Sequence, residues 1–232
     1  TLSTYPLVTH YGTHEARNAG RIYLGILLST SVGFLLFAML WTWQATGTLE
    51  FRPGGILAGH VDGPLVMLLL ALYAFGAGKA ALMPFHRWLP ATLAAPTPVS
   101  ALLHAGAVNA GALLLVRLHP VYDTAVASAL AIMAGTATLL YGAAVMLVKP
   151  DVKGALAHST MAQMGFMILT CGLGLWAAAV IHLVAHGFYK ATLFLSSGSA
   201  IAGLRRDAAV PHDIAATGRG RTLAATLSAA LP

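Results

Sequence analysis

Long runs of apolar residues, separated by short polar or glycine- and proline-rich stretches, follow one another along most of the chain. A helix needs about 20 residues to cross the hydrocarbon core of a bilayer, and six runs are near that length. They lie at about residues 22–45, 64–89, 99–118, 125–148, 154–170 and 176–204, and another run starts at residues 222–232. The pattern predicts an all-α, polytopic membrane helix bundle, with residues 1–232 in a single transmembrane domain.

The second run contains Pro84, which predicts a broken helix. Proline lacks a backbone N–H, and its ring crowds the carbonyl of the residue four positions earlier, here Ala80. A carbonyl that is freed inside a membrane needs water or a protein group as its partner. We therefore expect water at this break, connecting Lys79 with the surface near His86 and Arg87.

The composition of the chain supports a membrane protein. Hydrophobic residues make up 58% of the chain and charged residues only 9%, whereas soluble domains are about 25% charged. The net charge of +6 comes without a basic cluster interleaved with aromatic residues, which argues against a nucleic-acid partner. Cys171 is the single cysteine, so an internal disulfide is excluded. The chain starts without Met and stops inside an apolar run, so we expect a larger protein around it.

The positions of the basic residues predict the orientation in the membrane. With the six runs as spans, nine of the 13 Lys and Arg residues fall on one side and two on the other, while Lys79 and Lys190 remain inside the membrane. Cytoplasmic loops are enriched in Lys and Arg. We therefore expect a multi-pass protein of the cell inner (plasma) membrane, with the loops that contain Arg17, Lys149 and Arg205 in the cytoplasm.

The stretch Trp176–Leu204 carries the clearest chemical signal. His182, His186 and Lys190 follow one another at intervals of four residues, which places them on one face of a helix. Lys190 is 14 residues, roughly 21 Å, from either end of the stretch, which is too far for its amine to reach the surface. A charged amine at that depth costs several kcal/mol unless it faces protein or water, so we predict a functional role for it.

Two further basic groups are expected to act with this helix face. Lys79 follows Gly76 and Gly78, which let a neighbour approach closely, and precedes the break at Pro84, an arrangement typical of ion sites in transporters. His104 lies inside the third run. No Asp or Glu falls inside a predicted span, so we expect the carboxylate partner outside this chain. Three other histidines lie near predicted surfaces and receive no role: His86, His158 and His212.

Three alternatives to a proton path remain open. His182 and His186 have the spacing of a zinc pair, but no third ligand lies in a predicted span, and Lys190 would repel a cation. A haem held by His104 and His182 would make the protein an electron carrier, but it leaves both lysines unexplained. The groups could also be satisfied polar contacts of a membrane scaffold. Only a proton path uses Lys79, His104, His182, His186 and Lys190 together, because histidine and buried lysine can exchange protons near neutral pH. We therefore expect no metal and no cofactor.

Four motifs carry a resemblance to a known family. GKAALMPFHRWLP, APTPVSALLHA, DVKGALAHSTMAQMGFM and HLVAHGFYKATLFLSSGS resemble, in the same order, the antiporter-like membrane subunits of respiratory complex I, of Mrp-type cation/proton antiporters and of DAB-type inorganic-carbon transporters. The resemblance covers roughly residues 15–204. It implies that the six runs are helices six to eleven of a fourteen-helix-type antiporter-like fold with broken helices. In that fold, two inverted repeats carry a path of lysine, histidine and water for protons.

The resemblance also implies roles for single residues. Lys79 matches the lysine of the family's first broken helix, and His104 matches the histidine or lysine of the following helix. His182, His186 and Lys190 match the His-x-x-x-His-x-x-x-Lys helix of the second repeat. The glutamate that pairs with the first lysine would precede the chain, and the second broken helix would start in the last apolar run.

The segments QMGFMILTCGLG, HAGAVNAG and HGFYKATLFLSSGSA are most similar to the DAB-type membrane subunit. This similarity implies a flow of protons or sodium that drives bicarbonate accumulation. It also implies a complex with other membrane or peripheral subunits, among them a zinc-containing, carbonic-anhydrase-like partner. The alternatives are a subunit of an Mrp-type cation/proton antiporter and a subunit of an NADH:quinone oxidoreductase-like translocase. We identify no catalytic site within the chain itself.

Overall fold

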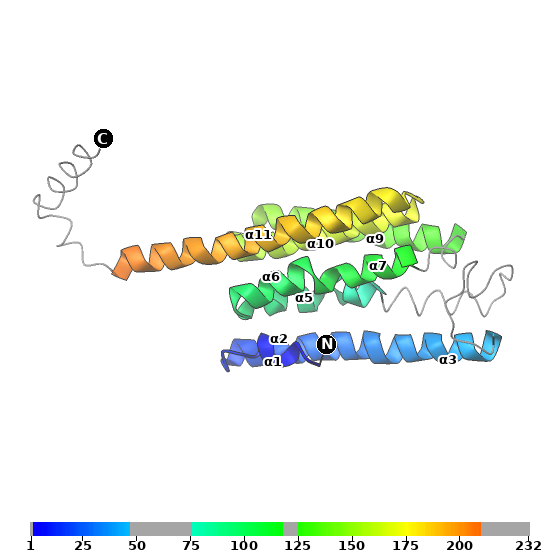
Figure 1. Cartoon of the computed structure of the whole chain (residues 1–232), viewed down its shortest axis with the longest axis horizontal. Helices are drawn as coiled ribbons and strands as arrows, with labels where there is room; N and C mark the ends of the chain where they lie inside the picture. Colours follow the sequence, from blue (N-terminus) through cyan, green and yellow to red (C-terminus); the bar gives the residue numbers. More distant parts are fainter. Residues whose placement is uncertain (1, 47–75, 118–124, 210–232) are drawn as a thin grey trace, which may run out of the picture. The chain divides into compact units, whose positions relative to one another are not determined.

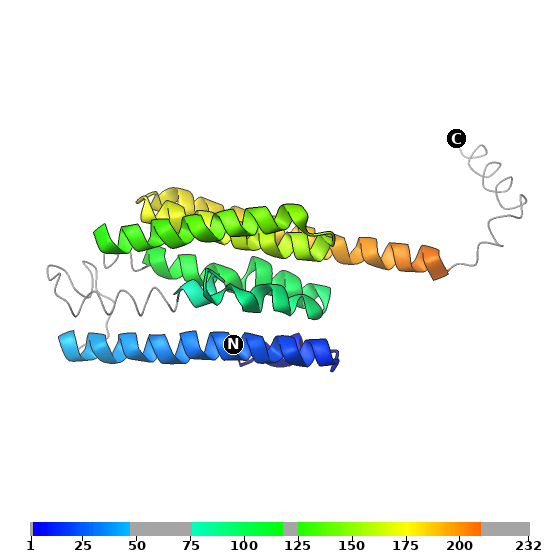
Figure 2. The ribbon, with the colours of Figure 1, turned by 180° about the vertical axis from the view of Figure 1, so that it is seen from behind.

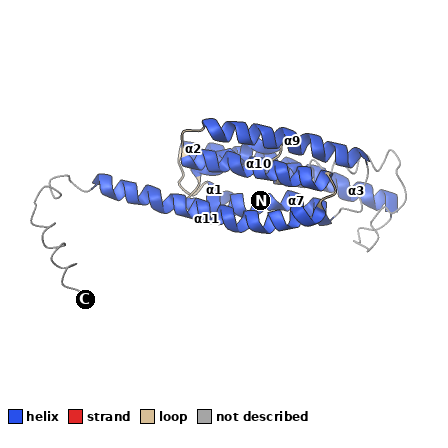
Figure 3. Ribbon diagram, turned by 90° about the horizontal axis from the view of Figure 1, so that it is seen from above, coloured by secondary structure: helices blue, strands red, loops and turns tan. Residues whose placement is uncertain are grey.

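The structure is a computed structural model that describes residues 2–46, 76–117 and 125–209. Residues 1–195 form one compact unit and residues 196–232 a second, and the arrangement described below is that of the first. Throughout the described ranges, the regular elements are helices joined by turns and short loops (Figure 3). The last apolar run, and most of the run that precedes the break at Pro84, lie outside the described residues.

The helices fall into three stretches of the chain. The first stretch contains α1 (Tyr5–Val8), α2 (His14–Leu28), the π-helix η1 (Ser29–Phe34) and α3 (Leu35–Thr46). The second stretch begins with helical residues 76–79 and continues with η2 (Phe85–Arg87), α5 (Trp88–Ala91), η3 (Thr92–Ala94), α6 (Thr97–Ala105), η4 (Ala107–Asn109) and α7 (Ala110–Arg117), where each η is a 3-10 helix. The third stretch contains α9 (Ala125–Val148), α10 (Val152–Gly172) and α11 (Trp176–Ala209).

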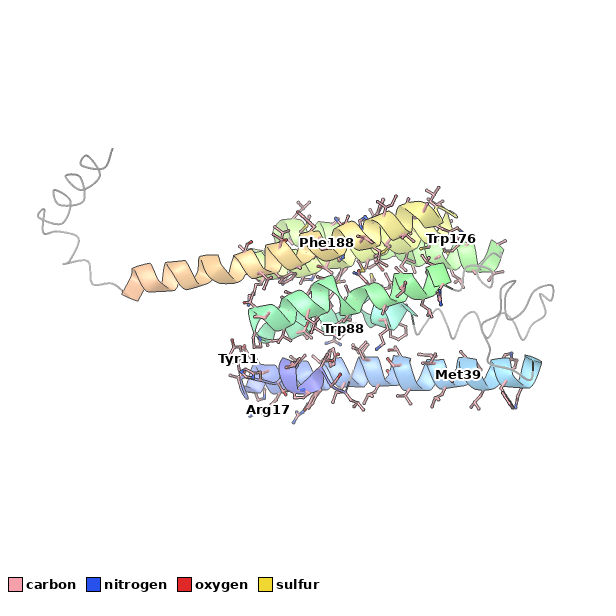
Figure 4. All side chains as sticks on the ribbon, in the orientation of Figure 1. Tyr11, Arg17, Met39, Trp88, Trp176 and Phe188 are labelled. Atoms are coloured by element: carbon pink, nitrogen blue, oxygen red, sulfur yellow. The ribbon has the colours of Figure 1, made fainter. Side chains whose placement is uncertain are left out.

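The three stretches form three layers of the first unit (Figures 1 and 2). The helices α2, η1 and α3 run on from one another as a single rod. The middle layer, from the break to α7, contacts α2 on one side and α10 on the other. Trp88 of α5 packs against α2 (Figure 4). The centroid of its ring lies 5.6 Å from that of Tyr23. The long pair α9 and α10 forms the third layer together with α11 up to Leu195 (Figure 3).

Within the described ranges, four helices are long and apolar enough to cross a membrane: His14–Trp41, Thr97–Arg117, Ala125–Val148 and Trp176–Gly198. They correspond to the first, third, fourth and sixth apolar runs. The fifth run forms α10, whose buried residues are spread around the whole helix. Large apolar side chains such as Met39 and Phe188 lie exposed on the outer helices (Figure 4). The all-α membrane bundle expected from the sequence is confirmed.

The helix ends follow local capping groups more closely than the apolar pattern. The helix α2 begins at His14, earlier than residue 22, because Thr13 caps it: its Oγ1 accepts a hydrogen bond from the backbone N of Ala16 at 3.1 Å. The helix α10 likewise begins ahead of the predicted residue 154, directly after its cap Asp151. The helix α9 has the predicted bounds, whereas α11 continues to Ala209 instead of ending at residue 204.

The third apolar run, predicted as one helix over residues 99–118, is interrupted. The helix α6 ends at Ala105, and the chain continues through Gly106, with φ −113° and ψ −71°, and η4 into α7. A Cβ atom on Gly106 would lie 2.9 Å from the carbonyl O of Leu102, so this close approach favours glycine. The interruption places His104 in the last turn of α6.

Glycines bring α9 and α10 into backbone contact. A Cβ atom on Gly142 would lie 2.6 Å from the backbone N of Ala162 and 2.8 Å from the backbone O of His158. One on Gly135 would lie 2.6 Å from the backbone N of Leu169. Such distances are shorter than any side chain tolerates, so the two helices form a tight pair that fixes the position of α10.

Candidate functional site

Lys190 lies in the interior of the helix bundle. Its side chain is fully buried, and its Nζ donates a hydrogen bond of 2.7 Å to Oγ of Ser159 on α10. The same ammonium group lies 5.8 Å from the centroid of the Tyr189 ring. A lysine amine is rarely found fully buried without a carboxylate beside it. The hydroxyl can accept a hydrogen bond from the charged amine or donate one to the neutral amine, whereas the aromatic ring favours the charged form.

The two histidines on the same face of α11 form a stacked pair. The ring centroids of His182 and His186 are 6.0 Å apart, and the ring planes are inclined by 20°. His182 also lies 5.3 Å from the ring of Phe166 on α10. His186 is buried, and the charge of Lys190 acts on it. The four-residue spacing therefore produces the shared face that the sequence predicts.

His104 comes to the same place from another helix. It is fully buried, and its ring stacks on Phe194 of α11 with a centroid distance of 4.4 Å and an inclination of 30°. The charges of Lys190 and His186 both act on its ring. The last turn of α6 and the face of α11 thus bring four of the five predicted basic residues into one cluster.

Five ring nitrogens in this cluster have no hydrogen-bond partner in the described part of the chain. They are Nδ1 and Nε2 of His104, Nε2 of His182, and Nδ1 and Nε2 of His186. A buried polar atom without a partner costs about 1–3 kcal/mol, and buried water is the usual partner of such atoms. We name these three histidines, with Lys190 and Ser159, the α11 cluster.

Lys79 belongs to a second neighbourhood, the helix break. It is half-buried, and it is the last residue of the helical segment 76–79. The backbone N of Ala81 donates to the carbonyl of Gly78 at 3.3 Å, and that of Leu82 donates to the carbonyl of Ala77 at 2.9 Å. With Ala81 at φ 52°, these two bonds form a Schellman turn, which ends the helix.

The predicted break is therefore confirmed, but it lies ahead of Pro84. The helix turns at residues 80–82, and Pro84 instead precedes the 3-10 helix η2 after a cis Met83–Pro84 peptide bond. Protein groups hold the turn: Trp88 Nε1 donates to the carbonyl of Gly78 at 2.8 Å, and the backbone N of Met83 donates to Oγ1 of Thr138 at 3.1 Å. We name residues 76–88 the break segment.

The glycines before Lys79 have different surroundings. A Cβ atom on Gly78 would lie 2.5 Å from Oγ1 of Thr30 in η1, so the expected close approach is confirmed there. A Cβ on Gly76 would meet Leu114 at 3.6 Å, an ordinary contact. The close approach at Gly76 comes from its carbonyl, which lies against Gly111 of α7.

Sequence reasoning missed two residues of this region. Ser159, the partner of Lys190, is not predicted by the sequence because serine is common in membrane helices and shows no periodicity of its own. The sequence predicts a position near a surface for His158, close to the start of α10, but only 6% of its side chain is exposed. The close approach of α9 to α10 covers it, and the motif AHST was the signal that could have found both residues.

The zinc hypothesis needs at least three ligands in one place. Within the described ranges, no group of three or more His, Cys, Asp or Glu side chains could hold a metal ion. His182 and His186 are neighbours, yet Lys190, on the same helix face, acts on His186 with its charge. The arrangement is that of a row of proton donors and acceptors, and not that of a set of metal ligands.

Comparisons with known proteins agree with this geometry. The model of the family described as NADH:quinone oxidoreductase/Mrp antiporter, TM, matches residues 1–216. In a solved structure of the Mrp complex from a Dietzia species, one chain is 32% identical, with a TM-score of 0.77 over 83% of this chain and 22% of that chain. The likeness confirms an antiporter-like fold with broken helices.

Two relatives represent the branches that the sequence indicated. The "Probable inorganic carbon transporter subunit DabB1" of Halothiobacillus neapolitanus is 42% identical over 190 residues, which are 77% of this chain and 34% of that protein. The "NADH-quinone oxidoreductase subunit L" of Pseudomonas aeruginosa is 39% identical over 209 residues, which are 86% of this chain and 34% of that protein. The chain thus spans about a third of the length of these relatives. It belongs to the NADH:quinone oxidoreductase/Mrp antiporter transmembrane family.

Proposed function

We propose that this chain is the part of a proton-translocating membrane subunit in which Lys190 exchanges protons with a water-connected row of histidines. One observation carries the proposal. A fully buried lysine, held by a neutral hydroxyl, lies with three histidines, and five of their ring nitrogens have no hydrogen-bond partner among the described residues. A scaffold would satisfy these groups within the protein, and a metal site would gather ligands instead of a lysine.

Each group in the α11 cluster has a defined part in the proposed transfer. Ser159 Oγ accepts a hydrogen bond from the charged amine of Lys190, and its hydroxyl can donate to the same nitrogen once the amine is neutral. Water between the histidines carries the released proton, since each imidazole accepts a proton on one nitrogen and releases one from the other. Lys79 serves as a second exchanger at the break segment. Moving one charge through 100 mV corresponds to about 2.3 kcal/mol, which a change of protonation at two such sites can store.

The proposed coupling is to the accumulation of inorganic carbon. The relatives named as inorganic carbon transporter subunits support it, from Halothiobacillus neapolitanus and, at 40% identity, from Bacillus subtilis. A carbonic-anhydrase-like partner that consumes or releases bicarbonate would complete such a transporter. The second candidate is a cation/proton antiporter or quinone-reductase subunit, which the Mrp complex and the subunit L relative support.

For the membrane arrangement we propose the six spans indicated by the apolar runs. The side that carries Arg17, Lys149 and Arg205 faces the cytoplasm of a plasma membrane. The described helix ends are compatible with this layout, since Lys149 and Lys153 flank the turn between α9 and α10. Labelling of single cysteines from either side of sealed vesicles, placed at Lys149 and Leu175, tests it. The layout predicts opposite accessibility at these two positions.

The central test of the proposed function replaces the buried amine. In the full-length protein with its partner subunits, Lys190→Ala should abolish proton transfer into proteoliposomes, read from an entrapped pH dye, while the complex still assembles. Lys149→Ala, at an exposed turn, serves as the matched control and should transfer protons at the unmodified rate. Unchanged proton transfer in Lys190→Ala would contradict the proposal. Uptake of bicarbonate against uptake of sodium in the same vesicles separates the two candidate couplings.

A further inference from the structure

We propose that His158, Tyr141 and His86 form a side branch of the proton path. This branch connects Lys190 with the basic end of the bundle, where α9 ends and α10 begins. The inference rests on the proposed function of Lys190 and adds an entry route for the proton. The three residues come from α10, α9 and η2, and none of them belongs to the α11 cluster. We name them the ring row.

The inner end of the ring row is the chain neighbour of the residue that binds the lysine. His158 precedes Ser159, whose hydroxyl accepts the hydrogen bond from Lys190. The Nδ1 of His158 donates to the carbonyl of Gly154 at 2.8 Å, since a carbonyl can only accept. That bond leaves Nε2 as the nitrogen that can take up a proton. The charge of His158 also acts on His104, which places it within electrostatic reach of the α11 cluster.

Tyr141 of α9 lies between the two histidines of the ring row. Its ring centroid is 6.5 Å from that of His158 and 5.1 Å from that of His86. A phenol hydroxyl both donates and accepts hydrogen bonds, and one water bridges polar atoms that are too far apart for a direct bond. Phenylalanine would pack equally well in this position, so the hydroxyl is the feature that calls for an explanation.

The break segment fixes the position of His86, which is the outer end of the ring row. The hydrogen bond from the backbone N of Met83 to Thr138 fixes η2 against α9, one turn before Tyr141. His86 is thereby placed on the Tyr141 ring, and its buried Nδ1 has no hydrogen-bond partner in the described part of the chain. Its neighbour Arg87 is exposed.

The depths of the three residues agree with a route to the basic side. His158 lies six residues, or roughly 9 Å, inside the start of α10, which begins at Val152. Tyr141 lies seven residues, or roughly 10 Å, from the end of α9 at Val148. Both helix ends meet at a short turn that carries Lys149 and is followed by Lys153 in the first turn of α10. In the proposed route, a proton enters at His86, passes through water and the Tyr141 hydroxyl to Nε2 of His158, and leaves toward Lys190.

The experiment uses the full-length protein with its partner subunits in proteoliposomes and measures the initial rate of proton transfer. Tyr141→Phe and His158→Gln should each lower the rate at least tenfold, and the double variant should be no slower than the slower single variant, since the groups act in series. The matched controls are Tyr11→Phe and His10→Gln, an exposed pair of the same residue types with ring centroids 5.5 Å apart. Both controls should keep the rate.

Lys190→Ala, measured in parallel, distinguishes a failure of the ring row from a failure of the proposed function. Rates within twofold of the unmodified protein in Tyr141→Phe and His158→Gln, with no transfer in Lys190→Ala, would overturn the ring row and leave the proposed function intact. Full transfer in Lys190→Ala would instead overturn the proposed function itself. If His158→Gln fails to assemble, Tyr141→Phe decides alone, because it removes a single hydroxyl from a side chain that is 38% exposed.

Discussion

Lys190 and Lys79 lie in the same unit, but their surroundings differ in which polar groups lack a hydrogen-bond partner among the described residues. Lys190 lies in the middle of α11, whose backbone is continuous from Trp176 to Ala209. Lys79 is the last residue before a Schellman turn. Around Lys190, ring nitrogens of three histidines have no hydrogen-bond partner within the described residues, whereas the freed backbone of the break segment finds partners in Trp88 and Thr138.

This difference indicates where each region is rigid. The hydrogen bonds of the break segment hold a bend in place, and they thereby position Lys79 and His86. The α11 cluster keeps its imidazole nitrogens available, which destabilises the bundle but permits exchange. Regions of this second kind are usually retained for function, because stability alone would select apolar side chains there.

The largest effect is expected where both regions share a support, at the contact of α9 with α10. Gly142→Ala places a methyl group 2.6 Å from the backbone N of Ala162, so the helices must separate. We expect destabilisation of about 3 kcal/mol, the upper end for overpacking, and loss of proton transfer. The measurement is thermal unfolding in detergent. Gly25→Ala, where a Cβ meets nothing within 4 Å, is the control; equal melting temperatures would contradict the packing.

A smaller loss of stability is expected at the break segment. Trp88→Phe removes the indole N–H that donates to the Gly78 carbonyl and leaves that carbonyl with a weaker set of partners. The expected cost is about 2 kcal/mol, together with slower proton transfer as Lys79 loses its position. Trp43→Phe, with 57% of its side chain exposed, should change neither quantity. Unfolding of Trp88→Phe at the same temperature as the unmodified protein would show that the bend does not depend on this bond.

The opposite pattern is expected in the α11 cluster. His104→Phe keeps the stacking on Phe194 and removes two buried nitrogens that have no partner in the described part of the chain. Stability should hold or rise by about 1 kcal/mol, while proton transfer falls at least tenfold. Thermal unfolding and the proteoliposome assay, performed on the same preparation, test both halves. A variant that is less stable and still transfers protons would reverse the comparison between the two regions.

The continuous region was easier to predict from the sequence than the interrupted one. The four-residue spacing of His182, His186 and Lys190 is a property of a single helix, so their shared face needed no tertiary information. The turn at residues 80–82 depends on Trp88 and Thr138, which reach it from other elements, and the proline alone does not predict that the helix ends before it. The water expected at Pro84 stays a prediction.

Residues whose partners lie on another helix could not be predicted from the sequence, for the same reason. Ser159 and His158 acquire their surroundings only when glycines bring α9 and α10 into backbone contact. No pattern within the α10 sequence predicts that contact, since its buried residues are spread around the whole helix. The third run is likewise interrupted at Gly106, where the carbonyl of Leu102 comes too close for a side chain, and a count of apolar residues does not detect this.

In the proposed path, water connects Lys190 to the histidines, and this water can be observed directly. A high-resolution structure of the full-length complex in lipid should show ordered water within about 3 Å of the ring nitrogens of His104 and His186, continuous toward Lys190. The same maps should leave the carbonyl of Gly78 bonded to Trp88. A dry, apolar packing of both imidazole rings at a resolution that shows water elsewhere would contradict the account.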